Sequence, residues 1–376
     1  MLRATIGSTL WILAFLMMAI SASAEAPPAL ISAVPLAGGP SGALAYRIRY
    51  YSTDTQGRRR EVTGAVMTPD GPAPAGGRDV IAWAHGTSGV AESCAPSISP
   101  DLYRSIAGLD AMLQRGYVVV AADYVGLGST GPHPFLVGES AGRTVIDAVR
   151  AARQLPAAAT TDRYAVWGES QGGHTALATG QIAAQYAPDL RLIAIAAAAP
   201  PTNLRANLTG GSNGPVKALL TAYTAQSWSQ YYGISLATIV KPLSQHLIQR
   251  LAMNCVSLDG VALRTKIGLL RLARQLRGVD ISKPPQWAEL LNRNSISPVA
   301  SDTPMLIAQG TSDTVVAPSV TRAFVKALCA NGQRVRYVPI ENGDHFTIGA
   351  RTATTTLEWL SAMFAGAVQP DDCSTQ

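Results

Sequence analysis

Three serines of the chain lie in a G-x-S-x-G pattern, which can hold a nucleophilic serine hydroxyl on a sharp turn. They are Ser140, Ser170 and Ser212. A nucleophile elbow needs a buried strand directly before the turn and a helix directly after it. Only Ser170 has both, an apolar run at 164–167 and a helical pattern at 173–186. The sequence therefore predicts Ser170 as a nucleophile, against the simpler interpretation that all three patterns are glycine-rich turns.

A serine hydroxyl is a poor nucleophile until a positioned base takes its proton, and histidine is the usual base. His345 follows an apolar run that ends at Ile340, late in the chain. This is the place of the base in the chain order serine, acid, histidine. His174, on the helix after Ser170, is expected to pack or to face solvent. The remaining histidines lie at a strand end, in a proline loop and in a helical stretch, and they are His85, His133 and His246.

An acid that orients this base is expected between Ser170 and His345. Asp313 follows the apolar run at 305–308, so it would lie at the same sheet edge. Asp302 precedes that run and would lie at the opposite edge, and Asp344 adjoins His345 too closely to hold the far side of its ring. A buried carboxylate at Asp313 would fix the tautomer of the imidazole and stabilise its charged form.

An ester hydrolase also needs backbone N–H groups that stabilise the oxyanion of the tetrahedral intermediate. The amide of Gln171, next after the nucleophile, is the expected first donor. Two segments could supply the second donor. One is the loop with Gly86 and Thr87, whose glycines also fit a plain turn, and the other is the strand end at Asp123.

A parallel sheet would position these residues. Short continuous apolar runs, the pattern of strands buried on both faces, alternate with helical stretches along the chain. This order predicts a doubly wound, mostly parallel α/β sheet, preceded by an antiparallel strand pair at 46–51 and 62–67. The predicted parallel strands are 80–84, 117–122, 164–167, 192–199, 305–308 and 335–340, and the predicted helices are 102–115, 139–155, 171–186, 319–330 and 352–364.

Residues 201–297 interrupt this alternation. They are bracketed by prolines and contain helical stretches rich in Leu, Ile and Arg, notably 234–252 and 261–277. We predict a helical cap inserted into the α/β domain rather than an independent domain. The amphipathic stretch at 234–252 would suit a moving lid, although such a stripe is also typical of a cap core.

The first 24 residues have the pattern of a secretory signal peptide. Arg3 precedes an apolar run at 10–20, and Ala22 to Ala24 offer an A-x-A cleavage site. A membrane-spanning helix needs about 20 apolar residues, which this run does not reach. We therefore expect residues 25–376 to form the mature catalytic domain, secreted to the extracellular space or the periplasm.

The four cysteines all follow this leader, and they are Cys94, Cys255, Cys329 and Cys373. Four cysteines permit three complete pairings. An oxidising compartment favours two disulfides over free thiols or metal ligation. The favoured pairing joins Cys94 to Cys255 and Cys329 to Cys373, the second closing a loop of about 45 residues around His345.

Three separated motifs keep a common order along the chain. They are Trp-Ala-His-Gly-Thr at 83–87, Asp-Tyr-Val-Gly-Leu-Gly at 123–128 leading to His133, and Gly-Glu-Ser-Gln-Gly-Gly at 168–173. Together they resemble the secretory lipase family, the lipase-A type of yeasts and its bacterial relatives. The resemblance spans about residues 31–368.

This resemblance implies an α/β-hydrolase fold with a helical cap that forms the acyl site. It also implies a triad at Ser170, Asp313 and His345, and an oxyanion hole at Asp123 and the residue after the nucleophile. Yeast members have a glycine at that place, whereas this chain has Gln171. The change keeps the backbone donor but alters the pocket beside it.

We therefore expect a secreted serine carboxylic ester hydrolase, a lipase acting on triacylglycerols or other acyl esters through an acyl-serine intermediate. A short-chain esterase, an acyltransferase or a peptidase could use the same triad, and a non-catalytic binding module could share the scaffold. A net charge of +6 without a basic stripe gives little reason to expect a nucleic-acid partner. The motifs imply no metal, no organic cofactor and no obligate protein partner, while a lipid–water interface is a candidate surface for binding.

Overall fold

The computed structural model describes residues 30–210, 214–258, 260 and 262–375. The predicted signal peptide at 1–24 and Ser212 lie outside the described residues. Among the described residues, no helix is both long and apolar enough to cross a membrane.

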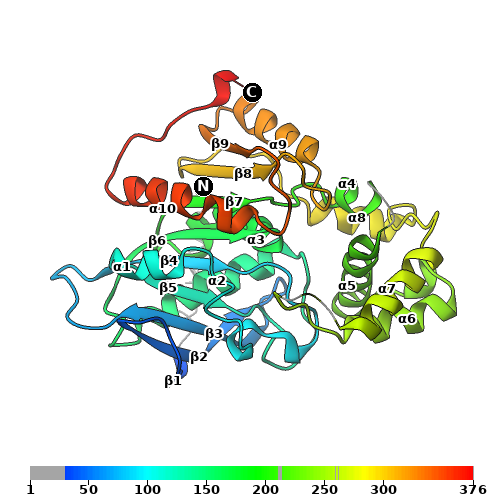
Figure 1. The fold of residues 1–376 in the computed structure, drawn as a ribbon, viewed down its shortest axis with the longest axis horizontal. Helices are drawn as coiled ribbons and strands as arrows, with labels where there is room; N and C mark the ends of the chain where they lie inside the picture. The colour runs from blue at the N-terminus through cyan, green and yellow to red at the C-terminus, as the bar shows by residue number, and fades with distance from the viewer. Residues whose placement is uncertain (1–29, 211–213, 259, 261, 376) are drawn as a thin grey trace, which may run out of the picture.

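A single sheet runs through the centre of the described part of the chain (Figure 1). Its strand order is β1-β2-β3-β5-β4-β6-β7-β8-β9. From β5 to β9 neighbouring strands are parallel, whereas β1, β2, β3 and β5 pair antiparallel in succession. The mostly parallel sheet and the antiparallel pair are thus confirmed. The strands are β1 (Leu30–Pro35), β2 (Ala43–Thr53), β3 (Arg59–Pro69), β4 (Arg78–Ala84), β5 (Val118–Ala122), β6 (Thr160–Glu169), β7 (Arg191–Ala198), β8 (Met305–Gly310) and β9 (Val335–Ile340).

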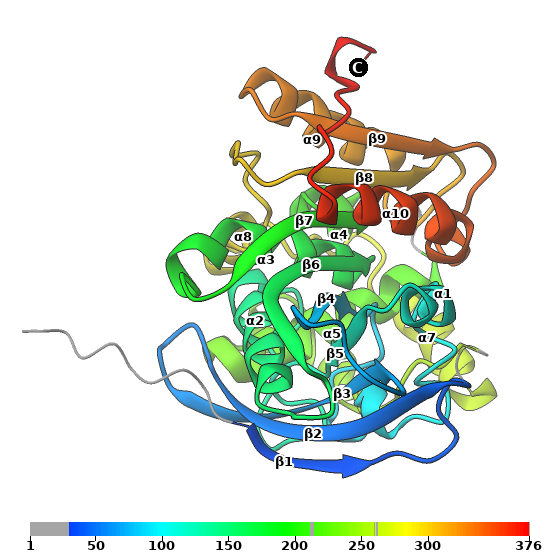
Figure 2. The same ribbon diagram turned by 90° about the vertical axis from the view of Figure 1, so that its left-hand side faces the viewer.

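Helices cover both faces of the sheet because alternate residues of each buried strand point to opposite sides. On one face α2, α3 and α9 pack over residues such as Val80 and Ala82, and on the other α1 and α10 pack over Ile81 and Trp83. Figure 2 shows these two layers on either side of the strands. The helices are α1 (Leu109–Gln114), α2 (Gly138–Arg153), α3 (Gln171–Tyr186), α9 (Pro318–Ala330) and α10 (Ile348–Phe364), with short 3-10 turns at η1 (Glu92–Cys94), η2 (Pro96–Ile98) and η4 (Cys373–Thr375).

Two elements differ from the sequence expectation. The helix expected at 102–115 is helical only at Leu109–Gln114, because Gly108 takes a left-handed conformation and starts the helix there. The Pro- and Gly-rich segment at residues 27–42, for which no strand was expected, contains the strand β1. Its backbone pairs with the edge of β2, and its β-branched residues Ile31 and Val34 are common in strands.

Between β7 and β8 the chain forms the segment that we call the cap, residues 201–297. Its helices are α4 (Leu204–Thr209), α5 (Pro215–Tyr232), η3 (Leu236–Thr238), α6 (Pro242–Ala252), α7 (Leu263–Gln275) and α8 (Pro285–Arg293). The helix expected over 234–252 is divided, because Pro242 starts a new helix at its first position. The cap buries its own apolar cluster, which includes Trp228 and Trp287 and also takes in Phe135 from the loop before α2.

Two disulfides join distant segments, with the pairing that the sequence favoured. Cys94 bonds to Cys255 with their Cα atoms 5.2 Å apart, and Cys329 bonds to Cys373 with a Cα separation of 5.5 Å. The first ties the cap to the loop after β4, where the Val256 amide also donates to the Ser88 carbonyl at 2.8 Å. The second fixes the C-terminal tail to α9.

Candidate active site

Ser170 lies on a sharp turn between the end of β6 and the start of α3. Its backbone is strained, with φ 54° and ψ −120°. The turn is possible only with glycines beside it: a Cβ on Gly172 would lie 1.8 Å from the carbonyl oxygen of Ala84, and one on Gly168 would lie 2.3 Å from the Gly172 oxygen. This geometry is that of a nucleophile elbow, with strand, turn and helix in immediate succession.

The structure brings Ser170, His345 and Asp313 into one hydrogen-bonded chain. His345 Nε2 lies 2.8 Å from Ser170 Oγ, and His345 Nδ1 lies 2.8 Å from Asp313 Oδ2. An ionised carboxylate can only accept hydrogen bonds, so the Nδ1–H group donates a hydrogen bond to Asp313. Nε2 therefore carries no hydrogen and accepts the hydrogen bond of the serine hydroxyl. The Asp313 side chain is fully buried and that of His345 is 8% exposed.

Asp313 is itself held by the loop after β8. Its Oδ1 accepts the amides of Val315 and Val316, each at 2.8 Å, and its Oδ2 accepts Gln309 Nε2 at 3.1 Å. Asp344, the neighbouring acid, instead accepts the Thr347 and Phe346 amides just before α10. These contacts fix the Asp313 carboxylate on the side of the ring away from the serine.

The amide of Gln171 lies at the first position of α3. The first N–H groups of a helix have no acceptor within the helix, so this donor is free to point at an anion beside the serine. The positive end of the α3 dipole lies at the same place. The geometry therefore suits the first expected oxyanion donor.

Asp123 does not fit the second donor role that the resemblance implied. Its backbone N–H already donates to the Thr63 carbonyl at 2.9 Å, as part of the pairing between β5 and β3. Its buried carboxylate accepts the Ser97 amide at 2.8 Å and the Thr63 hydroxyl at 2.6 Å. Burial raises the pKa of this carboxyl, while the hydrogen bonds from Ser97 and Thr63 oppose the shift. Asp123 is thus a structural residue that fixes the loop around Ser97.

The loop with Gly86 and Thr87 is better placed. It follows β4, whose last residue, Ala84, touches the elbow glycine Gly172, and a Cβ on Gly86 would lie 3.5 Å from the carbonyl oxygen of Glu169. The loop therefore passes beside the nucleophile, while the amide of Asp123 is bonded within the sheet. The loop with Gly86 and Thr87 therefore stays the candidate for the second donor.

The side chain of Gln171 is turned into the protein, towards His133. His133 Nδ1 donates to the Val125 carbonyl at 2.8 Å, so its Nε2 can accept Gln171 Nε2 at 3.3 Å. Burial lowers the pKa of His133 to about 3, which keeps the ring neutral. The sequence placed His133 in a proline loop and gave no sign that it anchors the residue after the nucleophile.

Glu169 is a feature of the site that sequence analysis missed. A Cβ on Gly349 of α10 would lie 1.7 Å from Glu169 Oε2, so the carboxyl fits against a helix that only glycine allows to approach. Burial raises the pKa of Glu169 to about 7, and the charge of His345 opposes the shift. The motif contains a glutamate before the serine, but nothing near it in the sequence indicates that distant contact.

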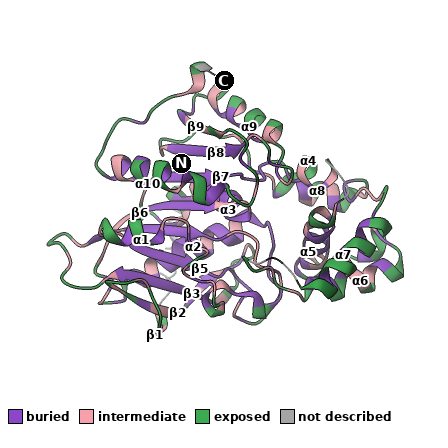
Figure 3. Ribbon diagram, in the orientation of Figure 1, coloured by how far each residue is buried: buried purple, intermediate pink, exposed green. Residues whose placement is uncertain are grey.

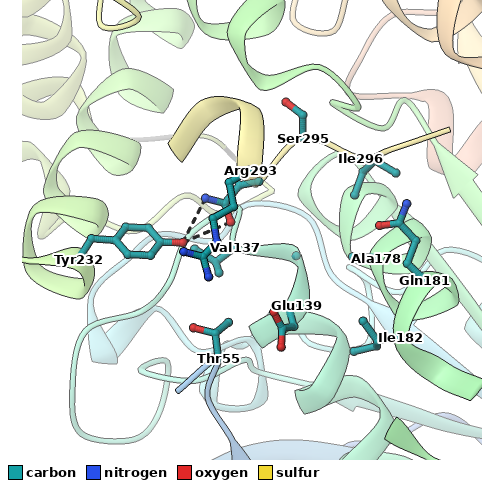
Figure 4. A pocket seen from close by; sticks show the side chains of 12 residues that line it. Thr55, Val137, Glu139, Ala178, Gln181, Ile182, Tyr232, Arg293, Ser295 and Ile296 are labelled. Atoms are coloured by element: carbon teal, nitrogen blue, oxygen red, sulfur yellow. Dashed lines mark hydrogen bonds between the residues drawn. The ribbon is translucent and has the colours of Figure 1, made fainter. Parts of the chain in front are cut away.

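Several cavities border the cap, and two of them differ in how they relate to the triad. One of about 550 Å³ lies between the cap helices α4 and α5 and the loop after Asp313, and its lining includes Thr314, Val315 and Phe346. It therefore reaches the residues directly after the acid and the base. A second cavity of about 220 Å³ lies between α2, α3 and α8, with Glu139, Tyr232 and Arg293 around it (Figure 4). No triad residue lines either cavity, but Thr314 and Phe346, which directly follow the acid and the base, line the first, so we associate substrate with the first.

The other candidates from the sequence have structural surroundings. His174 is buried with its Nε2 2.7 Å from the Asn294 carbonyl oxygen, and burial lowers its pKa to about 4. It packs and does not face solvent. Ser140 is buried in the first turn of α2, without a strand before it. Neither contacts the Ser170 hydroxyl.

The comparisons with known proteins agree on one family. A model of the family described as "Secretory lipase" matches residues 104–371. Lipase A of Moesziomyces aphidis is 22% identical over 371 residues, covering 90% of this chain and 76% of that protein. A Mycobacterium tuberculosis protein named a probable inactive lipase is also 22% identical, covering 87% of this chain and 75% of its own. The X-ray structure of Candida antarctica lipase A matches with a TM-score of 0.75 at 18% identity, covering 92% of this chain and 83% of that one, which supports the α/β-hydrolase fold.

Proposed function

The chain belongs to the secretory lipase family and is a carboxylic ester hydrolase, and we propose that it cleaves acyl esters with a triad of Ser170, His345 and Asp313. The observation that carries the proposal is the pair of 2.8 Å hydrogen bonds that link the three side chains. A serine on a strained elbow, a base within reach and a buried acid behind it have the roles that acyl transfer requires.

In the proposed reaction His345 Nε2 takes the proton of Ser170 as its Oγ attacks the ester carbonyl carbon. Asp313 stabilises the resulting imidazolium. The tetrahedral intermediate collapses as His345 passes the proton to the leaving alcohol oxygen, which leaves an acyl-serine. A water molecule then attacks the acyl carbon as His345 takes its proton. The second tetrahedral intermediate collapses as His345 returns this proton to Ser170 Oγ, and the carboxylic acid is released.

The oxyanion of both tetrahedral intermediates would be held by the amide of Gln171 and by an amide of the loop with Gly86 and Thr87. Each such donor is worth about 3–4 kcal/mol in the transition state. The Gln171 side chain is buried against His133, which keeps this side chain out of the space above the serine. We therefore propose that Gln171 contributes only its backbone N–H to the oxyanion hole.

The cavity of about 550 Å³ beside Phe346 is the proposed site for the acyl or alcohol group of the ester. Its walls combine apolar side chains of the cap, Val216 and Leu220, with the loop after Asp313. Ligand sites of enzymes are commonly apolar clefts with few polar groups. The cap would then select the substrate while the sheet performs the chemistry.

The direct test compares Ser170→Ala with Ser140→Ala in hydrolysis of p-nitrophenyl butyrate. We expect the first variant to lose activity by a factor of about 10⁴ or more. The second changes a serine with the same flanking pattern but no strand before it, and should keep the activity of the unchanged protein. Full activity of Ser170→Ala would refute the proposed nucleophile.

The relative named a probable inactive lipase makes labelling with a fluorophosphonate probe informative. Such a probe reacts with an activated serine and does not label a hydrolase fold that lacks a working triad. We expect labelling at Ser170 that disappears in Ser170→Ala and in His345→Ala. A complete lack of labelling in the unchanged protein would favour the non-catalytic binding module.

Lipase, short-chain esterase, acyltransferase and peptidase remain to be separated by substrate. We propose a lipase, secreted after removal of residues 1–24, and the two disulfides support an oxidising compartment. Activity on tributyrin should rise above its solubility limit. Activity without such a rise would support an esterase, while preference for an acceptor alcohol or an aminoacyl amide would support a transferase or a peptidase.

A further inference from the structure

Helix α7 of the cap has apolar residues on two opposite faces. Leu269 and Leu272 are buried against the rest of the cap. On the other side Leu263, Ile267 and Leu270 are 73%, 46% and 51% exposed. Their spacing of four and three residues places them in one stripe along the helix. A helix needs only one apolar face to pack in a globular protein, so the outer stripe requires another explanation.

Basic residues surround this stripe. Lys266 and Arg271 lie on its two sides, and Arg274 continues it by one further turn. All three are exposed. Among the described residues, no carboxylate forms a salt bridge with any of them, whereas many other arginines, such as Arg150, are paired. Within the described residues, the outer face of α7 is thus an apolar centre whose basic rim has no salt-bridge partner.

The charge of the chain is concentrated in this region. Residues 241–277 contain seven basic residues and one acidic residue, an excess equal to the +6 of the whole chain. The remaining residues contain 23 basic and 23 acidic side chains. Figure 3 shows that α6 and α7 form a largely exposed extremity of the molecule, far from β9 and α10. The net charge is therefore a local property of the cap.

We propose that the outer face of α7 binds to an anionic lipid–water interface, with Leu263, Ile267 and Leu270 inserted among the acyl chains. Lys266, Arg271 and Arg274 would contact the anionic headgroups around them. An amphipathic helix with a basic rim binds such a surface through buried apolar area together with attraction to anionic lipid. The proposal concerns adsorption and not ester cleavage, so it is tested independently of the triad.

Two other occupants fit the observations less well. A second copy of the chain would bring two faces of the same positive charge together in a two-fold interface. A nucleic acid would pair with the basic rim but would leave the central leucines and isoleucine in contact with a charged backbone. An anionic lipid surface satisfies the apolar stripe and the basic rim together.

The link between the cap and the sheet gives this adsorption a structural consequence. The Cys94–Cys255 disulfide and the hydrogen bond from Val256 to Ser88 attach the segment between α6 and α7 to the loop after β4. That loop contains Gly86 and Thr87. A molecule adsorbed through α7 is therefore held by a segment that is covalently joined to the surroundings of the nucleophile.

The test measures sedimentation of the protein with vesicles of ether-linked lipids, which an ester hydrolase cannot cleave. One set contains phosphatidylglycerol and phosphatidylcholine in equal parts, and the other contains phosphatidylcholine alone. We expect binding to the anionic vesicles to be at least about tenfold tighter. Replacing Lys266, Arg271 and Arg274 by Gln should reduce that binding by about tenfold or more.

Matched controls separate this surface from net charge. A variant with Arg191, Arg322 and Lys326 replaced by Gln has the same total charge and should bind as the unchanged protein does. Replacing Leu263, Ile267 and Leu270 by Ser should weaken binding, whereas replacing the exposed Val34, Val299 and Val368 by Ser should not. Circular dichroism and hydrolysis of p-nitrophenyl butyrate verify that each variant is folded.

Three outcomes would overturn the proposal. The first is equal loss of binding in the α7 variants and their controls. The second is equal binding of the unchanged protein to both kinds of vesicle. The third is binding of a DNA duplex that depends on Lys266, Arg271 and Arg274 in the absence of vesicle binding. Loss of hydrolysis in Ser170→Ala with vesicle binding retained would leave the two proposals separate.

Discussion

The sheet and the cap are both built on buried aromatic and aliphatic clusters, but their polar residues are arranged differently. In the sheet, the residues that could do chemistry follow the carboxyl ends of strands, as Ser170 follows β6 and Asp313 follows β8. In the cap, large apolar side chains lie on the solvent-exposed side of a helix, as on α7. The sheet fixes positions through its backbone, and the cap presents side chains on a surface.

This difference indicates what each region can tolerate. The elbow around Ser170 has no space for a Cβ on Gly168 or Gly172, so small changes there should abolish the geometry. The outer face of α7 is largely open to solvent among the described residues, so changes there should alter surface behaviour more than the fold. Activity should therefore depend on the sheet, and substrate and surface preference on the cap.

The largest predicted effect concerns the acid of the triad. Asp313→Asn should reduce kcat by about 10⁴-fold, because an amide at this place favours the wrong tautomer of the histidine. The loss should be the same for short and long acyl esters, since it affects only the chemical step. Asp302→Asn, which changes an exposed acid before the same strand, should leave kcat unchanged. Retained kcat in Asp313→Asn would show that another group orients His345.

The second prediction tests the link between the two regions. Replacing Cys94 and Cys255 by Ser should lower the free energy of unfolding by about 5 kcal/mol in the chain-entropy description of loop closure. The same change at Cys329 and Cys373, which closes a shorter loop, should cost about 4 kcal/mol. Urea denaturation measures both. Two separate transitions in the first variant would instead show that the cap unfolds by itself once it is released.

The sequence predicted the sheet well because each buried strand leaves a continuous apolar run. The run expected at 335–340 coincides with β9, and the one at 305–308 lies within β8. The cap was predicted only as helical, and the division of 234–252 at Pro242 was missed. Its helices pack around Trp228 and Trp287 from distant positions, and such contacts leave no local period in the sequence.

The candidate site divides in the same way. The order of Ser170, Asp313 and His345 could be predicted because each follows a recognisable strand. That the Asp123 amide is already hydrogen-bonded could not be predicted, because its acceptor is the carbonyl of Thr63, sixty residues earlier in the chain. Glu169 likewise depends on the approach of Gly349 from α10. Contacts between segments far apart in the sequence decide both.

The third prediction concerns Glu169, which is half-buried, and the dependence of stability on pH. The fold raises the pKa of Glu169 from its ordinary value of 4.5 to about 7, so the folded state binds the proton more tightly than the unfolded chain. Stability contributed by this group is thus present at low pH and is lost as pH rises from about 4.5 to about 7, by about 2–3 kcal/mol. Glu169→Gln should flatten that decline in urea denaturation. Glu358→Gln, an exposed residue of α10, should not, and an unchanged slope in Glu169→Gln would contradict the assignment.

The smallest predicted effect belongs to the cap. Val216 lines the cavity of about 550 Å³ between the cap and the loop after Asp313. Val216→Trp should fill part of this space and reduce kcat/KM for p-nitrophenyl octanoate by about tenfold, because a hydrophobic pocket distinguishes chain lengths by about 1–3 kcal/mol. The value for p-nitrophenyl acetate should hardly change, since the triad is untouched. Val34→Trp, on the exposed strand β1, is the matched control. An equal reduction for both esters would mean that the cavity does not receive the acyl chain and that chain-length preference is set within the sheet, beside Ser170.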